Sequence, residues 1–330
     1  MKRSSNPERT NPKADPEKRE KMERVAIIGP GAMGMLFSYY LKPVCPGLVL
    51  IDYREDRAKI LNEHGVRVET GEGVKTVPVR VTARPEEIGQ AELVLVCVKA
   101  YSTAEAVKRV LPIVNKESLV LTLQNGLGNL EAIMELVPKA QVLGGTTSMG
   151  ANVLEPGLVK FAGAGETIIG QAEAGTDKAE KAASLFQQAG LEVKTTDNLA
   201  GIIWSKVLIN VGINALTALL RVRNGSLLNY EGSRRVMAQA VKEAEAVVKA
   251  KGLQLIYPDA LARVEEVARK TGENISSMLQ DVRAKRRTEI DAINGAMVRE
   301  AERLGLSAPV NQALTNLVKA VEESYAEQIQ

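Results

Sequence analysis

From Arg24 onward, short apolar runs alternate with amphipathic stretches along the first part of the chain. Short apolar runs bounded by turn residues are typical of buried strands, and apolar positions recurring every three or four residues are typical of helices. The alternation favours an α/β fold with a mostly parallel sheet, because crossover helices join parallel strands. The expected strands are Val25–Ile28, Leu48–Ile51, Leu93–Val98, Leu119–Leu123, Val142–Asn152, Leu158–Phe161 and Thr167–Ile169, with a hairpin or extra strands at Val66–Glu69 and Val74–Val79. The expected helices are one ending near Leu41 and those at Asp56–Glu63, Thr103–Leu111 and Asp177–Ala189.

After about Asp197 the pattern becomes helical throughout. The expected helices are Leu199–Leu220, Ser233–Lys251, Asp259–Lys270, Ser276–Arg286, Glu289–Leu304 and Asn311–Glu323. We therefore predict an α/β domain over residues 23–197, followed by an all-helical C-terminal domain over residues 198–330. Residues 1–22 are polar, contain three prolines and show no apolar period, so we expect a disordered tail there.

Composition and charge exclude several classes of partner. The formal net charge is +3, but residues 1–24 hold eight Lys and Arg against five Asp and Glu, which accounts for all of it. The rest of the chain is balanced, so we expect no nucleic-acid partner. The N-terminal stretch lacks an apolar h-region and the longest apolar helix is interrupted by polar residues, so we expect no secretory signal and no membrane span. Two cysteines fit a reducing compartment, and we expect a cytoplasmic protein.

The single histidine, His64, excludes whole classes of catalytic mechanism. A Ser-His-Asp triad would need this residue, and no serine motif lies near it in the sequence. One histidine and two distant cysteines form no zinc ligand cluster, so we expect no metal. An acid–base enzyme built on this sequence would use Lys, Asp, Glu or Tyr as its proton carrier.

Polar residues interrupt the apolar helix Leu199–Leu220 at every fourth position. Lys206, Asn210 and Asn214 share one face of this helix, because four residues advance a helix by about 400°. A lysine and two amides buried on that face are costly unless something polar meets them. We interpret the stripe as the wall of a cleft that holds a small polar ligand. The alternative is that neighbouring backbone groups satisfy the three side chains.

A glycine-rich turn follows the first expected strand and opens a helix. Its sequence is Gly29-Pro30-Gly31-Ala32-Met33-Gly34. In a G-x-G-x-x-G turn, the first glycine allows the tight turn, the second lets a pyrophosphate approach the backbone, and the third permits close helix–strand packing. The helix N-terminus adds free N–H groups and a partial positive charge. The first domain is therefore predicted to be a Rossmann-like dinucleotide-binding domain.

The residues after the second strand leave the choice of dinucleotide open. Asp52 ends that strand, where an acid usually accepts the ribose 2′-hydroxyl of NAD. Arg54 and Arg57 follow closely, and either can meet the 2′-phosphate of NADP. Both arginines can equally belong to a solvated helix start. From these residues alone the two cofactors are about equally supported.

Two further loops follow the carboxyl ends of expected strands, in Val98-Lys99-Ala100-Tyr101 and Gln124-Asn125-Gly126. Such loops ring the ligand crevice of an open α/β sheet, so a lysine at position 99 would face the cofactor. A basic run before Glu289 has two interpretations. It is either a solvated helix face, which we favour, or a basic patch that attracts anionic ligands. The run consists of Arg283, Lys285, Arg286 and Arg287.

Together these motifs resemble those of ketopantoate reductases (2-dehydropantoate 2-reductases). The resemblance spans about Arg24 to Glu323 and rests on several separated motifs in the same order. Such a set is far more specific than a glycine turn alone. The motifs are Gly29-Pro30-Gly31-Ala32-Met33-Gly34, Val98-Lys99, Gln124-Asn125-Gly126, Trp204-x-Lys206-x-x-x-Asn210-x-x-x-Asn214, Asn224-Gly225, Ser276-Ser277-Met278-Leu279-Gln280-Asp281 and Thr288-Glu289-Ile290-Asp291.

The resemblance implies a reductase that moves a hydride from NADPH to the C2 ketone of 2-dehydropantoate, giving pantoate on the route to pantothenate and coenzyme A. It implies Lys206 as the proton donor, with Glu289 in the catalytic site. A desolvating cleft would lower the pKa of Lys206, and Glu289 would oppose that shift. The implied substrate-binding residues are Asn125, Lys206, Asn210, Asn214, Asn224 and Ser277. The implied cofactor-binding residues are Gly29, Pro30, Gly31, Ala32, Met33, Gly34, Arg54, Lys99, Asn125, Ala151 and Glu289.

Two alternatives stay open at this point. A reductase of the same family acting on another branched 2-oxo acid would carry the same motifs. A non-catalytic NAD(P)-binding sensor would use the fold for binding alone, although a sensor has no need of a buried proton donor. On the resemblance we predict NADPH as the cofactor and a small 2-oxo acid as the substrate, and we leave a homodimer open.

Overall fold

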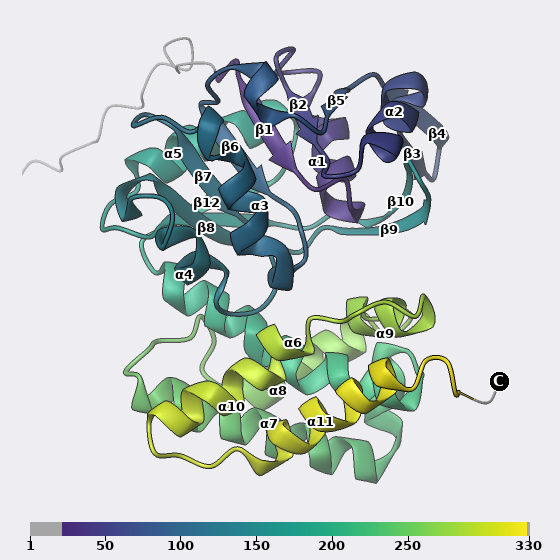
Figure 1. The fold of residues 1–330 in the computed structure, drawn as a ribbon. Coiled ribbons are helices and arrows are strands. Elements are labelled where there is room, and N and C mark those ends of the chain that lie inside the picture. The colour runs from purple at the N-terminus through teal and green to yellow at the C-terminus, as the bar shows by residue number, and fades with distance from the viewer. Residues whose placement is uncertain (1–21, 329–330) are drawn as a thin grey trace, which may run out of the picture.

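The computed structural model describes residues 22–328, which form an α/β lobe and a helical lobe (Figure 1). The tail expected over residues 1–22 lies outside the described residues except for its last member. Met22 corrects that boundary, because its side chain is 2% exposed and packs in the core of the α/β lobe. Strands of the first lobe are β1 (Val25–Ile28), β2 (Val49–Ile51), β3 (Val66–Thr70), β4 (Gly73–Val77), β5 (Arg80–Thr82), β6 (Leu93–Val96), β7 (Leu119–Thr122), β8 (Val142–Thr147), β9 (Gly150–Glu155), β10 (Leu158–Gly163), β11 (Thr167–Gln171) and β12 (Val193–Thr196). Its helices are α1 (Ala32–Leu41), α2 (Glu55–His64), α3 (Thr103–Val110), α4 (Asn129–Met134) and α5 (Asp177–Gln188).

The main sheet has eight strands in the order β12-β11-β8-β7-β6-β1-β2-β5. The six strands from β8 to β5 run parallel, whereas β11 pairs antiparallel with β8, and β12 follows β11. A smaller sheet, in the order β4-β3-β10-β9, lies beside it and packs against α1. The carboxyl ends of the six parallel strands therefore meet at one edge of the main sheet, where α/β folds bind their ligands.

Both faces of the main sheet are covered, which is why β6 and β1 near its centre are apolar at every position. In β1, Val25 and Ile27 belong to the core beneath α1 and α5, while Ala26 and Ile28 belong to the core beneath α3. Phe37 of α1 and Phe186 of α5 meet edge to face on the first side, with their ring centres 5.5 Å apart. Helices on both faces confirm the predicted Rossmann-like α/β fold.

One predicted strand of this lobe is wrong. The apolar run Val142–Asn152 is not a single strand, because the chain leaves the main sheet after Thr147 and joins the small sheet at Gly150. The first part pairs with β7 and β11, and the second part pairs with β10. Apolarity alone does not tell which neighbours a strand pairs with, so the sequence pattern could not place this break.

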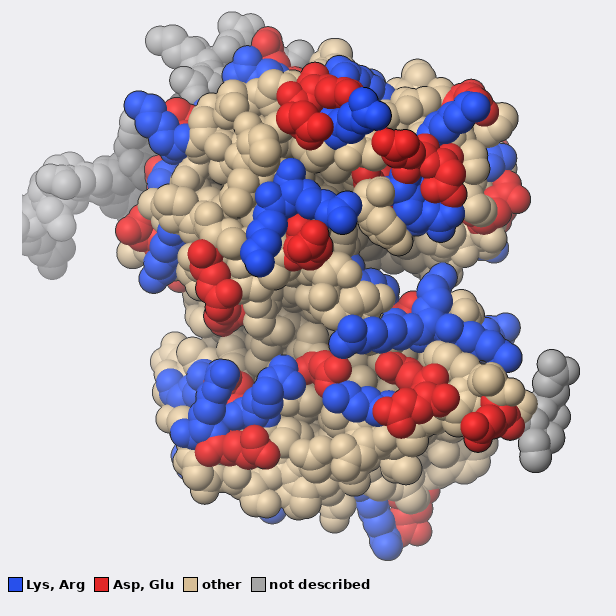
Figure 2. Space-filling view, viewed as in Figure 1, with Lys and Arg blue, Asp and Glu red and all other residues tan. Residues whose placement is uncertain are grey.

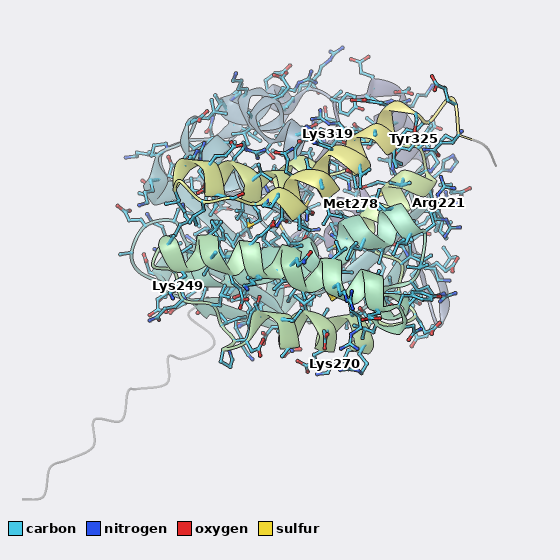
Figure 3. All side chains as sticks on the ribbon, turned by 90° about the horizontal axis from the view of Figure 1, so that it is seen from below. Arg221, Lys249, Lys270, Met278, Lys319 and Tyr325 are labelled. Carbon is cyan, nitrogen blue, oxygen red and sulfur yellow. The ribbon has the colours of Figure 1, made fainter. Side chains whose placement is uncertain are left out.

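The helical lobe is built around α6 (Leu199–Leu220), whose bounds the sequence predicts correctly. Asn198 caps its first turn by accepting a hydrogen bond from the backbone N–H of Gly201 at 3.0 Å. Around it pack α7 (Glu231–Ala250), α8 (Ala260–Lys270), α9 (Ser277–Arg283), α10 (Asn294–Arg303) and α11 (Pro309–Glu323). Figure 3 shows this lobe from below, with Arg221, directly after α6, and Lys249, near the end of α7, at opposite sides, as expected for antiparallel neighbours.

Helix α6 is long and apolar enough to cross a membrane, but 72% of its most apolar window is buried inside the structure. Core helices of soluble proteins have the same composition. A soluble protein is therefore consistent with this structure.

The predicted helix Glu289–Leu304 starts later than expected. Glu289 precedes a 3₁₀ turn at Ile290–Ala292, and the α-helix begins only at Asn294. The reason is a contact with the other lobe: the backbone N–H of Leu127 donates to the carbonyl of Ala292 at 2.8 Å. This contact fixes Glu289 at the boundary between the lobes.

Candidate active site

The candidate site residues of the α/β lobe lie along the carboxyl edge of the main sheet. Gly29 follows β1, Asp52 follows β2, Lys99 comes shortly after β6, and Asn125 comes shortly after β7. The last residue of β8, Thr147, completes the row. Five loops far apart in the sequence therefore share one edge, which faces the helical lobe through β8 and α6.

The glycine turn has the geometry that a pyrophosphate requires. Gly29 has φ +96°, a conformation that other residues adopt only with strain, and a Cβ on Gly34 would lie 2.0 Å from the carbonyl oxygen of Gly29. At Gly31 a Cβ would meet nothing closer than 3.9 Å, so the backbone there is open to a ligand. Among the described residues, no side chain caps the N-terminus of α1, where Ala32 and Met33 follow Pro30 and Gly31. The free N–H groups of this turn suit a phosphate, so a dinucleotide fits here.

Asp52, at the end of β2, is not free to bind a ribose in the way that the acid of an NAD-binding site is. Asp52 is buried, and its carboxylate receives both Nε and Nη2 of Arg57, the latter at 2.6 Å. Its Oδ1 also accepts the backbone N–H of Arg54 at 3.2 Å. The Arg54 side chain is half exposed and, among residues 22–328, pairs with Asp56 on the surface. The two arginines, which the sequence cannot distinguish, therefore have different surroundings.

Lys206 extends from α6 to the sheet edge. Its Nζ donates to the backbone carbonyl of Thr147, the last residue of β8, at 2.7 Å. Desolvation lowers the pKa of this lysine from 10.5 to about 8, and the negative charge of Glu289 opposes the shift. Both effects agree with the sequence-based expectation. The lysine therefore joins the two lobes and gives up its proton far more readily than a surface lysine.

The polar stripe of α6 is only partly satisfied by protein groups. The Nδ2 atom of Asn210, one turn beyond Lys206, is buried and has no hydrogen-bond partner among residues 22–328. Asn214, one turn further, is also buried. A buried amide without a partner costs about 1–3 kcal/mol unless a ligand or water meets it. The unpaired amide is what a polar ligand beside Lys206 would satisfy.

Across the boundary between the lobes, Lys99 is held by two acids of the helical lobe. Its Nζ lies 2.5 Å from Asp281 Oδ2 and 3.4 Å from Glu289 Oε2. Glu289 also accepts the backbone N–H of Ala100 at 2.9 Å. Burial acts to lower the pKa of Lys99, but Glu289 and Asp281 outweigh it, so the pKa is raised above its ordinary value. Glu289 therefore acts on both lysines of the site.

The structure adds Asp281 and Thr147 to the residues expected from the sequence. Asp281 is buried between Lys99 and Arg286, whose guanidinium donates to Oδ1 at 3.1 Å. Its signal in the sequence is its place at the end of the motif that runs from Ser276 to Asp281. Thr147 contributes only its backbone carbonyl, which leaves no signal in the sequence at all.

Asn224 and Ser277 lie on neighbouring segments near α6. Asn224 donates from Nδ2 to Thr271 Oγ1 at 2.9 Å, while its buried Oδ1 has no partner among the described residues. Ser277 begins α9 and is half-buried. The neighbouring Ser276 caps that helix and hydrogen-bonds Thr217 of α6 at 2.7 Å, so α9 is fixed against the polar stripe's helix.

Asn125 and Ala151 are the least connected of the expected residues. Asn125 lies in the loop after β7, and its backbone carbonyl accepts Nδ2 of Asn129 at 3.0 Å. Ala151 lies in β9 of the small sheet, where it packs against the core of the α/β lobe. No described contact joins Ala151 to Lys206 or to the glycine turn, so its assignment stays a prediction.

The four basic side chains of the run are exposed to solvent, as favoured from the sequence, but only Arg283 belongs to a helix. Helix α9 ends at Arg283, and Lys285 takes a left-handed conformation with φ 49°. Arg286 binds Asp281, and the guanidinium of Arg287 lies 4.5 Å from the ring centre of Tyr101 in the other lobe. Two of the four cations thus contact the site's own residues or the facing lobe.

The surface of the molecule is hollowed between the two lobes, and basic side chains gather on the helical side of this hollow (Figure 2). Among residues 22–328, no group of three or more His, Cys, Asp and Glu side chains could hold a metal ion. The chemistry that the described residues offer is therefore that of a dinucleotide turn, a lysine of lowered pKa and several amides.

Family comparisons agree with this arrangement. The family model "Ketopantoate reductase PanE/ApbA" matches residues 25–174, and "Ketopantoate reductase PanE/ApbA C terminal" matches residues 198–322. The 2-dehydropantoate 2-reductase of Halobacterium salinarum is 38% identical over 90% of this chain and 98% of its own length. The enzyme of the same name from Pyrococcus abyssi is 36% identical over 91% of this chain and 98% of its own.

Solved structures give the same result. The crystal structure of 2-dehydropantoate 2-reductase from Geobacter metallireducens has a TM-score of 0.84 at 32% identity, covering 90% of this chain and 99% of that one. D-mandelate dehydrogenase with NADH and anilino(oxo)acetate has a TM-score of 0.87 at 29% identity, covering 92% of this chain and 99% of that one. The resemblance stated from the sequence motifs is confirmed: the chain belongs to the ketopantoate reductase family.

Proposed function

We propose that this chain reduces 2-dehydropantoate to pantoate with NADPH, as an oxidoreductase acting on CH–OH groups in pantothenate and coenzyme A biosynthesis. The proposal is supported by relatives named 2-dehydropantoate 2-reductase at 38% and 36% identity over almost the whole of their length. The main structural support for this function is the environment of Lys206. Its amine is held at the sheet edge by Thr147 with a pKa of about 8, beside an unpaired amide of Asn210.

The division of work between the lobes is part of the proposal. Residues 23–197 form the cofactor-binding domain, and residues 198–330 form the substrate-binding and catalytic domain. On the cofactor side we place the turn from Gly29 to Gly34 through Pro30, Gly31, Ala32 and Met33, together with Arg54, Lys99, Asn125, Ala151 and Glu289. On the substrate side we place Asn125, Lys206, Asn210, Asn214, Asn224 and Ser277.

NADPH, when bound, supplies the hydride that reduces the C2 ketone. Lys206 holds a proton on Nζ and gives it to the C2 oxygen as that oxygen gains negative charge. Below pH 8 the lysine is mostly protonated, and its lowered pKa makes the transfer easier than from an ordinary lysine. Glu289 keeps the lysine protonated near neutral pH, because its negative charge opposes the loss of the proton.

Amides suit the substrate's polar groups. Asn210 and Asn214 lie one and two turns along α6 from Lys206, and they can bind a carboxylate or hydroxyl without adding a charge that would disturb the lysine. Asn224 and Ser277 approach from the segments packed on α6. The positive charge on Lys206 attracts an anionic 2-oxo acid.

The second candidate is a reductase of a different 2-oxo acid. It is supported by the likeness to D-mandelate dehydrogenase, whose structure holds NADH and anilino(oxo)acetate. The third candidate, a non-catalytic sensor, does not explain the lowered pKa of Lys206 or its position at the sheet edge. We further propose that the enzyme works in the cytoplasm, and a homodimer is left to measurement.

The test is NADPH oxidation with a panel of 2-oxo acids that includes 2-dehydropantoate. We expect 2-dehydropantoate to give the highest kcat/KM, and a clear preference for another acid would replace the substrate. Lys206→Ala should lose about 10²–10⁴-fold in kcat while NADPH binding survives. Lys249→Ala, which removes an exposed lysine of α7, is the matched control and should be unaffected. Near-normal turnover in a folded Lys206→Ala variant would show that another residue carries the proton.

A further inference from the structure

We infer that Arg57 sets the cofactor preference of this chain by occupying the carboxylate of Asp52, so that the subsite beyond β2 accepts a 2′-phosphate. The inference rests on the proposed function only in that the glycine turn holds a dinucleotide. In this role Arg57 neutralises Asp52 without contacting the phosphate, and Arg54 makes the contact with the phosphate.

The position of Asp52 alone would favour NADH. It follows β2, next to β1 in the sheet, and the backbone N–H of Gly29 in the glycine turn donates to Ile51 at 2.9 Å. An acid at this point of a dinucleotide fold accepts the ribose 2′-hydroxyl and repels a 2′-phosphate. A free carboxylate here would therefore work against NADPH.

The structure shows that this carboxylate is not free. Asp52 is 1% exposed, and Arg57 binds it through Nε and Nη2, the bidentate geometry of the strongest carboxylate pairs. Counting the backbone N–H of Arg54, three of the roughly four acceptor positions of the carboxylate are occupied. The pair is neutral overall, so little acceptor capacity is left for a ribose hydroxyl and the repulsion of a phosphate is removed.

Arg57 is itself held in place. It belongs to the first turn of α2, and its guanidinium lies 5.5 Å from the ring centre of Tyr53, whose side chain is 68% exposed. A cation over an aromatic face is attracted to the ring, which restricts the guanidinium. Arg54, in contrast, is half exposed, and its partner in the described part of the chain is the exposed Asp56, so its guanidinium can turn to an incoming phosphate at little cost.

Two variants separate this role from direct phosphate binding. Arg57→Ala leaves the Asp52 carboxylate without its partner, and we expect the preference for a 2′-phosphate to fall about 10- to 100-fold, the range for a hydrogen bond to a charged group. Asp52→Asn removes the charge but keeps the shape. Because the carboxylate is already occupied, we expect this variant to bind an unphosphorylated ribose as well as the parent does, within twofold, and a 2′-phosphate at least as tightly.

The measurement is calorimetric titration with 2′,5′-ADP and 5′-AMP, repeated with NADPH and NADH by fluorescence. Arg235→Ala is the matched control, because it removes an exposed arginine of α7 in the other lobe and should leave both affinities unchanged. Thermal melting checks the fold of each variant. If Arg57→Ala fails to fold because Asp52 is left unpaired, the affinities of Asp52→Asn for 5′-AMP and NADH test the inference alone.

An unchanged ratio of affinities in folded Arg57→Ala would overturn the inference, and so would a tenfold loss of 5′-AMP or NADH affinity in Asp52→Asn. These outcomes are independent of the proposed reaction, since no 2-oxo acid is present. A parent protein that binds NADPH but reduces no 2-dehydropantoate would overturn the proposed function and leave this inference intact.

Discussion

The pKa of Lys206 predicts the pH dependence of the reaction. Reduction needs the protonated lysine, so kcat/KM should be flat at lower pH and fall about tenfold per pH unit above pH 8, where the proton is lost. Oxidation of pantoate needs the neutral lysine, so its rate should rise through the same pH range and level off above it. With an ordinary lysine, the fall in the reduction rate and the rise in the oxidation rate would both occur more than two pH units higher, near pH 10.5.

Glu289→Gln should move the fall of kcat/KM, the alkaline limb of the pH profile, to lower pH. Glu289 raises the pKa of Lys206, so removing its charge lets desolvation act alone. A shift of one unit in the pKa corresponds to about 1.4 kcal/mol. Lys99 lies 3.4 Å from Glu289 and offsets part of its charge, so we expect roughly half a unit to one unit.

The assay is the pH profile of kcat/KM for 2-dehydropantoate, measured in both directions. Asp281→Asn is the control, because Asp281 contacts Lys99 but is not among the charges that shift Lys206. It should change affinity for NADPH and leave the limb near pH 8. A limb that moves upward in Glu289→Gln, or one that stays near pH 10 in the parent, would refute the assignment of Lys206 and Glu289.

Three further outcomes are expected. Asp281→Asn should lower the melting temperature by about 1–4 °C, because it breaks a contact whose acid is buried but whose lysine is 37% exposed; we estimate a cost of about 1–3 kcal/mol, and calorimetry measures it. Asn214→Ala and Ser277→Ala should raise KM for 2-dehydropantoate more than they lower kcat, which steady-state kinetics would show; a loss confined to kcat would contradict substrate binding. Deleting residues 1–21 while keeping buried Met22 should leave kcat and the melting temperature unchanged, and a large loss of either would show that this segment contributes to the fold.

The sequence predicts best those features that depend on neighbouring residues. The bounds of α6 are correct because Asn198 caps one end and the apolar run stops at the other. The glycine turn and the end of α2 at His64, before Gly65 with φ 70°, are local in the same way. Each of these signals lies within a few residues of the structure that it determines.

Features that depend on distant residues could not be predicted from this one sequence. Lys99 and Asp281 are 182 residues apart, and neither has a neighbour in sequence that indicates the other. The break between β8 and β9 depends on which strands lie beside them. The sequence predicts that the basic run is solvated, but it cannot show the contacts of Arg286 with Asp281 and of Arg287 with Tyr101 of the other lobe.

The contacts between the lobes place the charge of Glu289 near both lysines of the site. Glu289 belongs to the helical lobe, yet it accepts a hydrogen bond from Ala100 and faces Lys99 of the other lobe. The same charge acts on Lys206, whose amine is in turn held by Thr147 of the α/β lobe. Any movement that separates the lobes would therefore weaken the hold on Lys206 and remove part of the charge that keeps it protonated. Under the proposed role of Lys206 as proton donor, we therefore expect proton transfer to depend on the contact between the sheet edge and α6.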